Sequence, residues 1–478
     1  MLSQRVSQKV AVGAVYVAAL FMTIMDSTIV NVTLPAMGHE FGVASAAVNG
    51  VVIYYLVALA AAIPVSGWLG DRFGGRRVLL GAILLFVVAS ALCGAAQSLS
   101  QLELLRVLQG VAGGLMTPVG MAMLWRVFPP AERARAAAIL VIPTAIAPAL
   151  GPVLGGYFVT YMSWRWVFYV NVPIGLVAVV FGLLFLAEQR LDDAGAFDLA
   201  GFVLAGSGLG LLMFGLSKGP IDGWTDPAIV ATCLAGAVLL VVLVAVELRR
   251  AEPLLKLRLL AARLFGLCNA VMILGVIGFL GTIFVVSLFY QDGLGLNALQ
   301  AGLSIFPEAL GVMAGSQLVA KVLYPRFGPR RILFGGLMLA AAMMLALTSV
   351  GAQTSLWVPR SILFCMGFGM SALFIAVQTA AFANTSHDDM GAASTLLNTQ
   401  QQLGGAIGVA ILTTVFVAAG PVTPAGGGPV PDLSAYRVAF VTAAAFAVLA
   451  ACVALFIHDS DAASTITPSP DRAREAGR

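Results

Sequence analysis

The fold of this chain is decided by the segment Asp71-Arg72-Phe73-Gly74-Gly75-Arg76-Arg77, which returns 254 residues later as Pro325-Arg326-Phe327-Gly328-Pro329-Arg330-Arg331. An arginine inside an apolar stretch follows each turn at the same spacing, Arg106 in the first half and Arg360 in the second. The same spacing relates Gly113 to Gly367 and Met116 to Met370. One spacing shared by several pairs indicates a duplicated unit, and two related halves are a common architecture of secondary transporters.

The composition is that of a membrane protein. Of the 478 residues, 60% are hydrophobic and only 10% are charged, and the mean hydropathy is +0.98. Soluble domains have about 45–50% apolar and about 25% charged residues. The charges are clustered, and the apolar runs between them are long enough for helices that cross roughly 30 Å of hydrocarbon. We therefore expect an all-α polytopic membrane protein.

Fourteen spans are expected from the apolar runs. Their approximate limits are 10–35, 46–69, 77–97, 102–124, 137–160, 166–187, 198–217, 227–247, 265–289, 299–319, 331–351, 356–380, 397–419 and 436–457. The repeat spacing aligns spans 2 to 5 with spans 10 to 13, so spans 7 and 8 are an insertion between two six-helix bundles. The expected domains are a bundle at 1–190, the inserted helices with their linkers at 191–257, a second bundle at 258–460 and a disordered cytoplasmic tail at 461–478.

The basic residues predict the topology. Of the 26 lysines and arginines, 21 lie in one set of alternating segments, 3 lie in the opposite loops and 2 lie within spans. The positive-inside rule then places both termini in the cytoplasm. The first apolar run contains Asp26 and has no clear cleavage site, so we interpret it as a retained span of a multi-pass protein of the cell inner (plasma) membrane.

Several classes of site are not expected. The five cysteines lie in apolar runs without paired spacing, and the three histidines are scattered, which argues against disulfides and against a metal site. The net charge of +4 follows from membrane topology and does not indicate nucleic-acid binding. The sequence has no nucleotide-binding glycine-rich loop, no catalytic triad and no sizeable soluble domain, so we expect neither an enzyme nor a bound cofactor.

Five motifs together resemble the major facilitator superfamily, and the fourteen spans resemble its drug:proton antiporter branch. The motifs are Gly67–Arg77 between spans 2 and 3, Arg106–Gly110 in span 4, Pro148–Gly156 in span 5, Asp26–Pro35 in span 1 and Ser163–Pro173 before and within span 6. The resemblance extends to about residue 458. It implies alternating access driven by the proton gradient, with substrate export coupled to proton entry.

The resemblance implies an exporter of amphipathic, often cationic drugs or toxic compounds, as in multidrug efflux and antibiotic resistance. Its expected partners are such substrates, protons and membrane lipids, and the protein is expected to act as a monomer. An alternative is export of a dedicated lipid, siderophore or secondary metabolite. A proton symporter for import and a non-transporting sensor or scaffold also remain open, although the span-5 motif and the intact Asp26 and Arg106 argue against them.

Asp26 and Arg106 are the first candidates for proton coupling. A lone charge at this depth costs about 2.5–3.5 kcal/mol on insertion scales, so it faces a wet cavity or a partner. Burial favours the neutral carboxyl and a nearby arginine favours the charged one, so a rearranging site can switch Asp26. Arg106 keeps its charge and is the expected partner. The alternatives are an inert, hydrogen-bonded Asp26 and an Arg106 that bonds only backbone carbonyls.

Glu308 is the third candidate, in a span beside Pro307. Three roles stay open: a second proton carrier, a counter-charge for cationic substrates, or a satisfied carboxylate near the outer mouth. Arg360 repeats Arg106 without the Gln-Gly that follows it, so a structural role is equally expected.

Asp71, Arg72 and Arg76 are expected to form a cytoplasmic latch. Glycines permit the tight turn, and the charges can bridge helix ends across the two halves. The resemblance implies that the latch stabilises an outward-open state, and the alternative is that these charges only set topology. Pro325 replaces the acidic residue in the second copy, so the latch is expected to be asymmetric.

The span-5 motif contributes small residues for close helix packing, and the resemblance implies that Gly151, Pro152, Gly155 and Gly156 also prevent leakage. A central cavity with apolar, aromatic and amide walls is expected as well. Methionine suits such loose recognition. The expected wall residues are Met22, Met25, Tyr54, Tyr55, Gln109, Phe279, Phe284, Phe374, Asn398 and Gln401.

Overall fold

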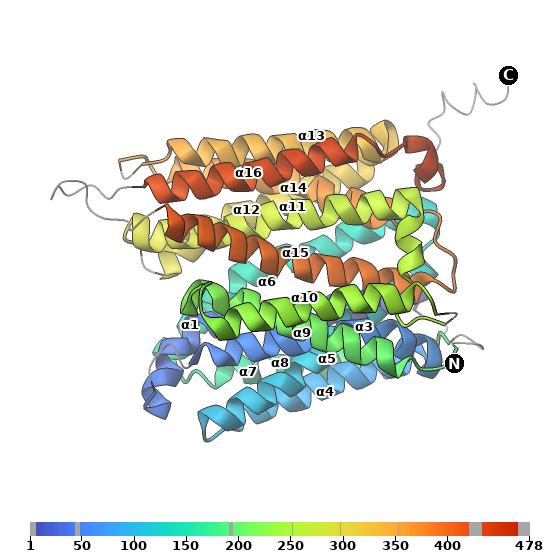
Figure 1. Ribbon diagram of the computed structural model, residues 1–478, viewed down its shortest axis with the longest axis horizontal. Helices are drawn as coiled ribbons and strands as arrows, with labels where there is room; N and C mark the ends of the chain where they lie inside the picture. Colours follow the sequence, from blue (N-terminus) through green and yellow to red (C-terminus); the bar gives the residue numbers. More distant parts are fainter. Residues whose placement is uncertain are drawn as a thin grey trace. The chain divides into compact units, whose positions relative to one another are not determined.

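The computed structural model describes residues 6–43, 48–190, 195–250, 252–296, 298–351, 353–419 and 433–466. Within these ranges the chain is helical and contains no β-strand, which confirms the all-α prediction (Figure 1). The helices of the first half are α1 (Gln8–Phe41), α3 (Gly50–Phe73), α4 (Gly75–Ala95), α5 (Leu99–Val127), α6 (Arg133–Tyr161), α7 (Trp166–Tyr169) and α8 (Asn171–Phe185). Those that follow are α9 (Leu199–Asp222), α10 (Pro227–Glu247), α11 (Arg263–Leu288), α12 (Ala298–Leu318), α13 (Tyr324–Ala346), α14 (Trp357–Ala380), α15 (Met390–Ala418) and α16 (Ser434–Ala454).

Polar side chains and glycines set several helix ends. The Ser98 hydroxyl accepts a hydrogen bond from the backbone of Gln101 at the start of α5, and Asp226 caps α10 just before Pro227. Such caps satisfy backbone N–H groups that have no partner within the helix. Gly74 separates α3 from α4 with a φ of 98°, a conformation that other residues rarely adopt. These signals break a nearly continuous apolar sequence into separate spans.

Thirteen segments of the described chain are long and apolar enough to cross a membrane. One of them, Gln300–Ser349, has 50 residues and holds both α12 and α13, joined by the π-helical turn Val319–Leu323. Within it Gly328 has a non-helical φ of 73°. This segment therefore contains two of the predicted spans, 299–319 and 331–351, and the described helices agree with the predicted fourteen.

The chain divides into two compact units. Unit 1 comprises residues 1–128, 146–258 and 386–399, and unit 2 comprises residues 129–145, 259–385 and 400–478. This division differs from the predicted boundaries in two ways. The inserted helices α9 and α10 belong to unit 1, and the first halves of α6 and α15 each belong to a different unit from the second halves.

Unit 1 is held together by close helix contacts at small residues. The helix α5 meets the backbone of α3 at Gly110 and Gly114, where a β-carbon would collide with the carbonyl oxygens of Tyr55 and Leu59. The helix α8 packs against α1 and α4, and α9 packs against α3 and α10 (Figure 1). Small residues allow this approach between helices whose surroundings are as apolar as their own side chains.

Unit 2 is built in the same way. The helix α14 packs against α12 and α13, and α16 packs against α11 and α13 (Figure 1). A β-carbon at Gly369 of α14 would lie 2.6 Å from the carbonyl oxygen of Gly336 in α13, and the reverse distance is the same.

The predicted tail begins too early. We expected disorder from residue 461, but the structure has a 3-10 helix at Asp459–Thr465. The Thr465 hydroxyl lies 2.7 Å from that of Tyr324, and Ala462 is fully buried. The rest of the predicted tail, 467–478, lies outside the described residues.

Candidate functional site

The structure brings Asp26 and Arg106 together inside unit 1. Asp26 lies on α1 and Arg106 on α5, and both side chains are completely buried. The Arg106 Nη1 donates to Asp26 Oδ2, and its Nε donates to the backbone oxygen of Val51 over 2.9 Å. Arg106 therefore pairs with the carboxylate, as expected of a partner for Asp26, and also bonds a backbone carbonyl of a neighbouring helix.

Three donors surround the Asp26 carboxylate. Arg106 serves Oδ2, while Oδ1 accepts from Gln109 Nε2 at 2.9 Å and from Asn171 Nδ2 at 3.1 Å. Hydrogen bonds to a charged acceptor are stronger than neutral ones. All three residues direct N–H groups at the oxygens of the Asp26 carboxylate.

Aromatic rings enclose the guanidinium of Arg106. Its central carbon lies 4.1 Å from the ring centre of Tyr55 and 5.7 Å from that of Phe168. Both rings are fully buried, and the Tyr55 hydroxyl reaches the backbone oxygen of Thr23 at 3.4 Å. A cation above a desolvated ring gains about 2 kcal/mol or more. The rings hold the charge in a dry position where it interacts strongly with the carboxylate.

Ser90 on α4 connects the polar groups behind Asp26. Its Oγ donates to the backbone oxygen of Phe168 at 2.8 Å and accepts from Gln109 at 3.2 Å and Asn171 at 3.1 Å. We call Asp26, Ser90, Arg106, Gln109 and Asn171 the Asp26 cluster. Its members come from α1, α4, α5 and α8, so a change in its charge acts on four helices of unit 1 at once.

Sequence reasoning missed Ser90 and Asn171 as members of this cluster. Both are fully buried polar residues within predicted spans, a placement that signals a polar partner. Asn171 also lies in the Ser163–Pro173 motif, whose role the sequence left unassigned. Tyr55 and Gln109 were expected to line a substrate cavity, but the structure places both against Arg106.

Asp71 lies in a second charged cluster of unit 1. Its carboxylate forms an ion pair of 2.6 Å with Arg126, whose Nε also donates to the backbone oxygen of His387. A β-carbon at Gly391, in the first turn of α15, would lie 2.7 Å from the Asp71 carboxylate. A negative charge is favourable beside the first turn of a helix. Asp71 therefore interacts with both α5 and the start of α15.

The other two predicted latch residues lie elsewhere. Arg76 donates from its side chain to the backbone oxygen of Leu183 at 2.7 Å and from its backbone to Glu188 at 3.0 Å, which links α4 to the end of α8. Arg72 is exposed, and the described chain gives its side chain no hydrogen bond or ion pair. Arg126, and not Arg72 or Arg76, forms the ion pair with Asp71. The sequence showed Arg126 only as one of many basic residues that flank spans.

Among the residues that the structure describes, the second half has no equivalent of the Asp26 cluster around Arg360. This half-buried arginine donates to the Ser304 hydroxyl at 3.1 Å and lies 5.2 Å from the ring centre of the exposed Trp357. Glu308 is on α12 of unit 2, where its backbone oxygen faces Gly367 of α14. In the described ranges no ion pair involves Arg360 or Glu308, so the structure does not join Glu308 to the other two proton-coupling candidates.

The glycines of the span-5 motif differ in their contacts. A β-carbon at Gly151 would collide with Thr28, and one at Gly155 would lie 3.0 Å from the backbone oxygen of Ile29, so α6 packs tightly on α1. At Gly156, by contrast, a β-carbon would have no described atom within 4 Å. The side chain of Pro152 lies outside the described part of the structure. Close packing therefore explains Gly151 and Gly155 but not Gly156.

The predicted cavity walls are only partly open. Met22 and Met25 are fully buried, as are Tyr55 and Gln109, so these four line no accessible surface in this structure. Asn398 is also buried and bonds the backbone oxygen of Ser394. The remaining predicted residues are partly accessible or packed in pairs: Tyr54 and Phe284 are each 37% exposed, Gln401 is half-buried, and Phe279 meets Phe374 edge-on at 5.8 Å.

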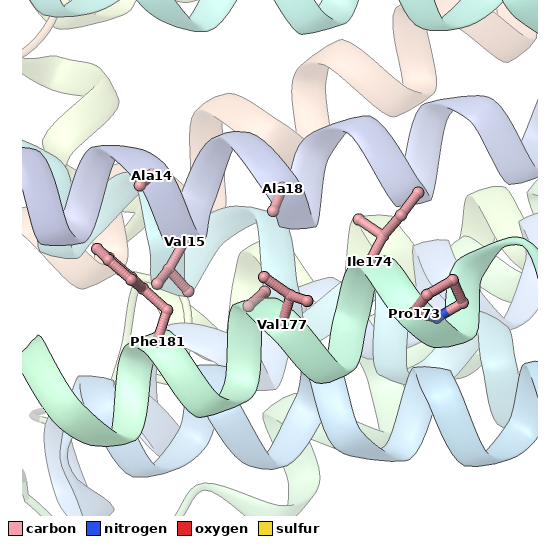
Figure 2. A pocket seen from close by; sticks show the side chains of 8 residues that line it. Ala14, Val15, Ala18, Pro173, Ile174, Val177 and Phe181 are labelled. Carbon is pink, nitrogen blue, oxygen red and sulfur yellow. The ribbon is translucent and has the colours of Figure 1, made fainter.

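An apolar groove of about 540 Å³ lies between α1 and α8 on unit 1 (Figure 2). Val15 of α1 faces Val177 and Phe181 of α8 across it, and all of its lining side chains are apolar. Such a groove holds no group that can exchange a proton or bind an ion. Among the described residues there is also no group of three or more side chains suited to holding a metal.

Comparisons with known proteins extend this picture. The profile of the Major Facilitator Superfamily matches residues 16–409. The chain is 33% identical to the "Multidrug resistance protein B homolog" of Mycobacterium tuberculosis, over 84% of this chain and 75% of that protein. It is 32% identical to the "Puromycin resistance protein pur8" of Streptomyces alboniger, over 93% and 90% respectively. The human organic anion transporter MFSD10 (TETRAN) has a similar fold, with a TM-score of 0.68 at 16% identity, over 94% of this chain and all of that one.

Proposed function

Because this chain belongs to the Major Facilitator Superfamily and is a multi-pass membrane transporter rather than an enzyme, we propose that it exports amphipathic, often cationic compounds in exchange for protons. The relatives named for multidrug and puromycin resistance support drug export. The observation that supports proton exchange most strongly is the fully buried ion pair of Asp26 and Arg106. We assign to Asp26 the binding and release of the proton.

The physical mechanism follows from the charge balance of the Asp26 cluster. A proton on Asp26 neutralises the carboxylate and leaves the charge of Arg106 buried beside Tyr55 and Phe168 without its counter-charge. Breaking a buried ion pair costs about 3–5 kcal/mol. Protonation therefore destabilises the arrangement of α1, α4, α5 and α8 around the cluster. A rearrangement of these helices that opens the substrate site relieves this cost, and release of the proton restores the pair.

We call Asp71, Arg126 and the first turn of α15 the Asp71 cluster, and we propose that it is the conformational latch of this cycle. Asp71, Arg126 and the first turn of α15 are in contact in this structure, and such contacts must separate when α15 moves away from α3 and α5. The ion pair is partly buried, with side-chain exposures of 14% for Asp71 and 3% for Arg126. Partial burial protects the ion pair from screening by salt. Removal of the pair therefore changes the free-energy difference between the conformations.

Export of one dedicated compound is the second candidate. The relative named for resistance to a single antibiotic, puromycin, covers more of this chain than the multidrug homologue does. The two candidates differ in the number of unrelated compounds that elicit proton movement.

The test uses the purified protein in liposomes with an acidic lumen. Cationic, neutral and anionic amphiphiles are added outside, and substrate-triggered proton efflux is followed in the wild type, Asp26→Asn and Asp222→Asn. Asp222 is a matched control, because it pairs with Lys218 on the partly exposed end of α9. We expect responses to several unrelated cations, lost only in Asp26→Asn. Responses to one compound class favour the dedicated exporter, and normal coupling in Asp26→Asn overturns the role of Asp26.

A further inference from the structure

Asn171 has an unusual hydrogen-bonding state in the Asp26 cluster. Its Nδ2 donates to both Asp26 and Ser90, each at 3.1 Å, but its Oδ1 is buried and has no hydrogen-bond partner. The residue itself is 0% exposed. Leaving a buried acceptor unsatisfied costs about 1–3 kcal/mol. Because this acceptor lies beside a carboxyl that is proposed to bind and release a proton, it is placed to accept a hydrogen bond in the other protonation state.

Gln109 is the other amide at Asp26, and both of its ends are occupied. Its Oε1 accepts from Arg106 at 2.8 Å, and its Nε2 donates to Asp26 and to Ser90. Turning this amide would point its N–H groups at the guanidinium, which has only donors. Arg106, which only donates, therefore fixes the orientation of Gln109, whereas Asn171 is oriented by Asp26 and Ser90, whose hydrogen-bonding roles change when Asp26 binds a proton.

The segment that precedes Asn171 is anchored by side-chain hydrogen bonds. Trp164 donates to Glu40 at 2.5 Å, and Arg165 donates to Glu40 and to the backbone oxygens of Gly94 and Ala96 at 2.6–2.8 Å. Pro173 lacks the N–H that would bond the backbone oxygen of Tyr169, which explains the interruption between α7 and α8. Asn171 begins α8 directly after this interruption. A half-turn of its amide is a rotation about a side-chain bond and requires no change in the backbone.

A protonated Asp26 needs an acceptor that this structure does not present. Ionised aspartate only accepts hydrogen bonds, whereas the protonated acid also donates one. Arg106, Gln109 and Asn171 all direct N–H groups at it. A half-turn of the Asn171 amide exchanges Nδ2 for Oδ1 and supplies the acceptor, and the Ser90 hydroxyl can redirect its proton from Phe168 to the same oxygen.

We infer that Asn171 is a positioning residue for proton exchange, and that its amide turns to accept the hydrogen bond of Asp26 when Asp26 binds a proton. This inference rests on the proposed role of Asp26. The step adds one proton to Oδ1 of the carboxylate, changes its charge from −1 to 0 and breaks no covalent bond. Asn171 stabilises both protonation states in turn, as a donor to the carboxylate and as an acceptor from the acid.

A purely structural role makes a different prediction. If Asn171 only ties the start of α8 to α1 and α4, its replacement changes stability or rate but not the hydrogen bonding of the Asp26 acid. The carbonyl stretch of a protonated carboxyl reports that bonding directly, because its frequency rises when the acid loses the acceptor of its O–H.

The test is pH-difference infrared spectroscopy of the full chain in lipid, with Asp26→Asn assigning the Asp26 band. In Asn171→Leu we expect this band at a higher frequency than in the wild type, whereas Val177→Leu, on the exposed face of α8, leaves it unchanged. In wild-type protein with ¹³C-labelled asparagine side chains, we also expect an amide band that shifts on acidification and is absent from the difference spectra of Asp26→Asn and Asn171→Leu.

The outcomes separate the inference from the function on which it rests. If no acid-induced carboxyl band is lost in Asp26→Asn, Asp26 does not exchange protons and the role proposed for it in transport is wrong. If that band is present but has the same frequency in Asn171→Leu, Asn171 does not accept its proton and the inference is overturned. Asn171→Ala gives the same reading should Asn171→Leu not fold: it also removes the acceptor, so we expect an upward shift, and no shift contradicts the inference.

Discussion

Arg106 and Arg360 occupy equivalent positions in the two halves but have different surroundings. Arg106 is fully buried and bonded to Asp26, Gln109 and Val51, whereas Arg360 is half-buried and bonds Ser304. The repeat spacing of 254 residues explains the difference. The positions equivalent to Asp26, Tyr55, Ser90 and Gln109 are Leu280, Ala309, Met344 and Leu363. The second half therefore keeps the arginine of the duplicated unit but none of the groups that surround it.

A repeated arginine therefore identifies a helix position and not a chemical function. The function depends on what neighbouring helices present to the guanidinium, and those residues lie up to 80 positions away in sequence, as Asp26 does from Arg106. In the first half, four helices converge on one charge pair. In the second half, the same helix position contributes a hydrogen bond between α14 and α12 and a contact with the ring of Trp357.

The largest expected difference comes from replacing each arginine with lysine. Lysine keeps the charge but cannot bond Val51, Asp26 and Gln109 at once or stack on Tyr55. Each hydrogen bond to a charged group is worth about 1.5–3 kcal/mol, so Arg106→Lys should lower proton-coupled transport by at least about tenfold. Arg360→Lys should stay within about twofold of the wild type. Substrate-triggered proton flux in liposomes measures both, and equal losses would show that the two sites are functionally alike.

The aromatic rings beside the two arginines also differ in their exposure to solvent. Tyr55 is fully buried under Arg106, whereas Trp357 beside Arg360 is 72% exposed. Tyr55→Leu removes a buried ring and its interaction with the cation, so we expect it to cost about 1–3 kcal/mol. For Trp357→Leu we expect about 0.5 kcal/mol or less.

Thermal unfolding in detergent compares these two variants, and Tyr55→Phe serves as the control. Phenylalanine keeps the ring and loses only the 3.4 Å hydrogen bond to Thr23, so its melting temperature should stay close to that of the wild type. A loss in Tyr55→Phe as large as in Tyr55→Leu would assign the stabilisation to the hydroxyl instead of the ring.

The sequence predicted the fold and part of the Asp26 cluster for identifiable reasons. Hydropathy and the spacing of basic residues predict spans, because a membrane helix must bury about 20 apolar residues. Asp26 and Arg106 were found because a charge in a span needs a partner. Ser90 and Asn171 were not found, because the sequence does not tell which face of α4 or α8 turns toward α1. Nearly every face of these helices is apolar, so periodicity gives no guide.

The Asp71 cluster was predicted less well, because its partners come from distant segments. Arg126 and Gly391 follow Asp71 by 55 and 320 residues, and neither shows a spacing that links it to Asp71. The sequence indicated asymmetry at Pro325, which stands where Asp71 would be repeated, and Ala380 stands where Arg126 would be repeated. The position of Gly391 beside Asp71 depends on the long-range packing of α15, which the sequence does not show.

Neutralising Asp71 tests whether this asymmetric pair acts as a latch. Asp71→Asn replaces the 2.6 Å ion pair with Arg126, and we expect a loss of about 1.5 kcal/mol, or roughly a tenfold change in the ratio of conformations. Spin labels at the exposed positions Phe73 and Asp388, in a variant without native cysteines, report the distance between the α3–α4 turn and the start of α15.

The reciprocal change Arg126→Gln should have a similar effect, and the double variant should be no worse than either single variant, because both remove one interaction. Unchanged distance distributions in Asp71→Asn would remove the basis for the latch. Gly391→Ala offers an independent route, since its β-carbon would press on the Asp71 carboxylate.

A smaller effect is expected where the two halves are alike. Glu188 accepts a hydrogen bond from the backbone of Arg76 at 3.0 Å, and Asp459 accepts one from the equivalent Arg330 at the same distance. Gly74 and Gly328 both have positive φ and lie against these carboxylates. Glu188→Gln and Asp459→Asn should each cost about 0.5–1 kcal/mol, the usual value of a charge at a helix start. If the two variants lose clearly different amounts of melting temperature relative to the wild type, the two halves do not share this capping.

The smallest effect concerns the start of α15, where Asp389 stands at the position that Arg135 occupies in the first repeat. Burial raises the pKa of Asp389, but hydrogen bonds from Lys256 and Ser386 and the charge of Lys256 outweigh burial and hold the pKa below its usual range. The pair with Lys256 measures 2.6 Å. Since the pKa is lower in the folded protein than in the unfolded chain, this carboxylate stabilises the fold above the usual aspartate pKa of about 3.9.

That contribution is lost as the pH falls through the lowered pKa of the folded state. We therefore expect Asp389→Asn to reduce the melting temperature slightly at neutral pH, and the difference from the wild type to shrink toward zero as the pH is lowered below about 4. Lys256→Gln should show the same dependence, because it removes the strongest cause of the low pKa. A difference that is constant with pH would mean that the charge of Asp389 does not stabilise the fold, and the pair with Lys256 would then not help to fix the start of α15 to the linker that follows α10.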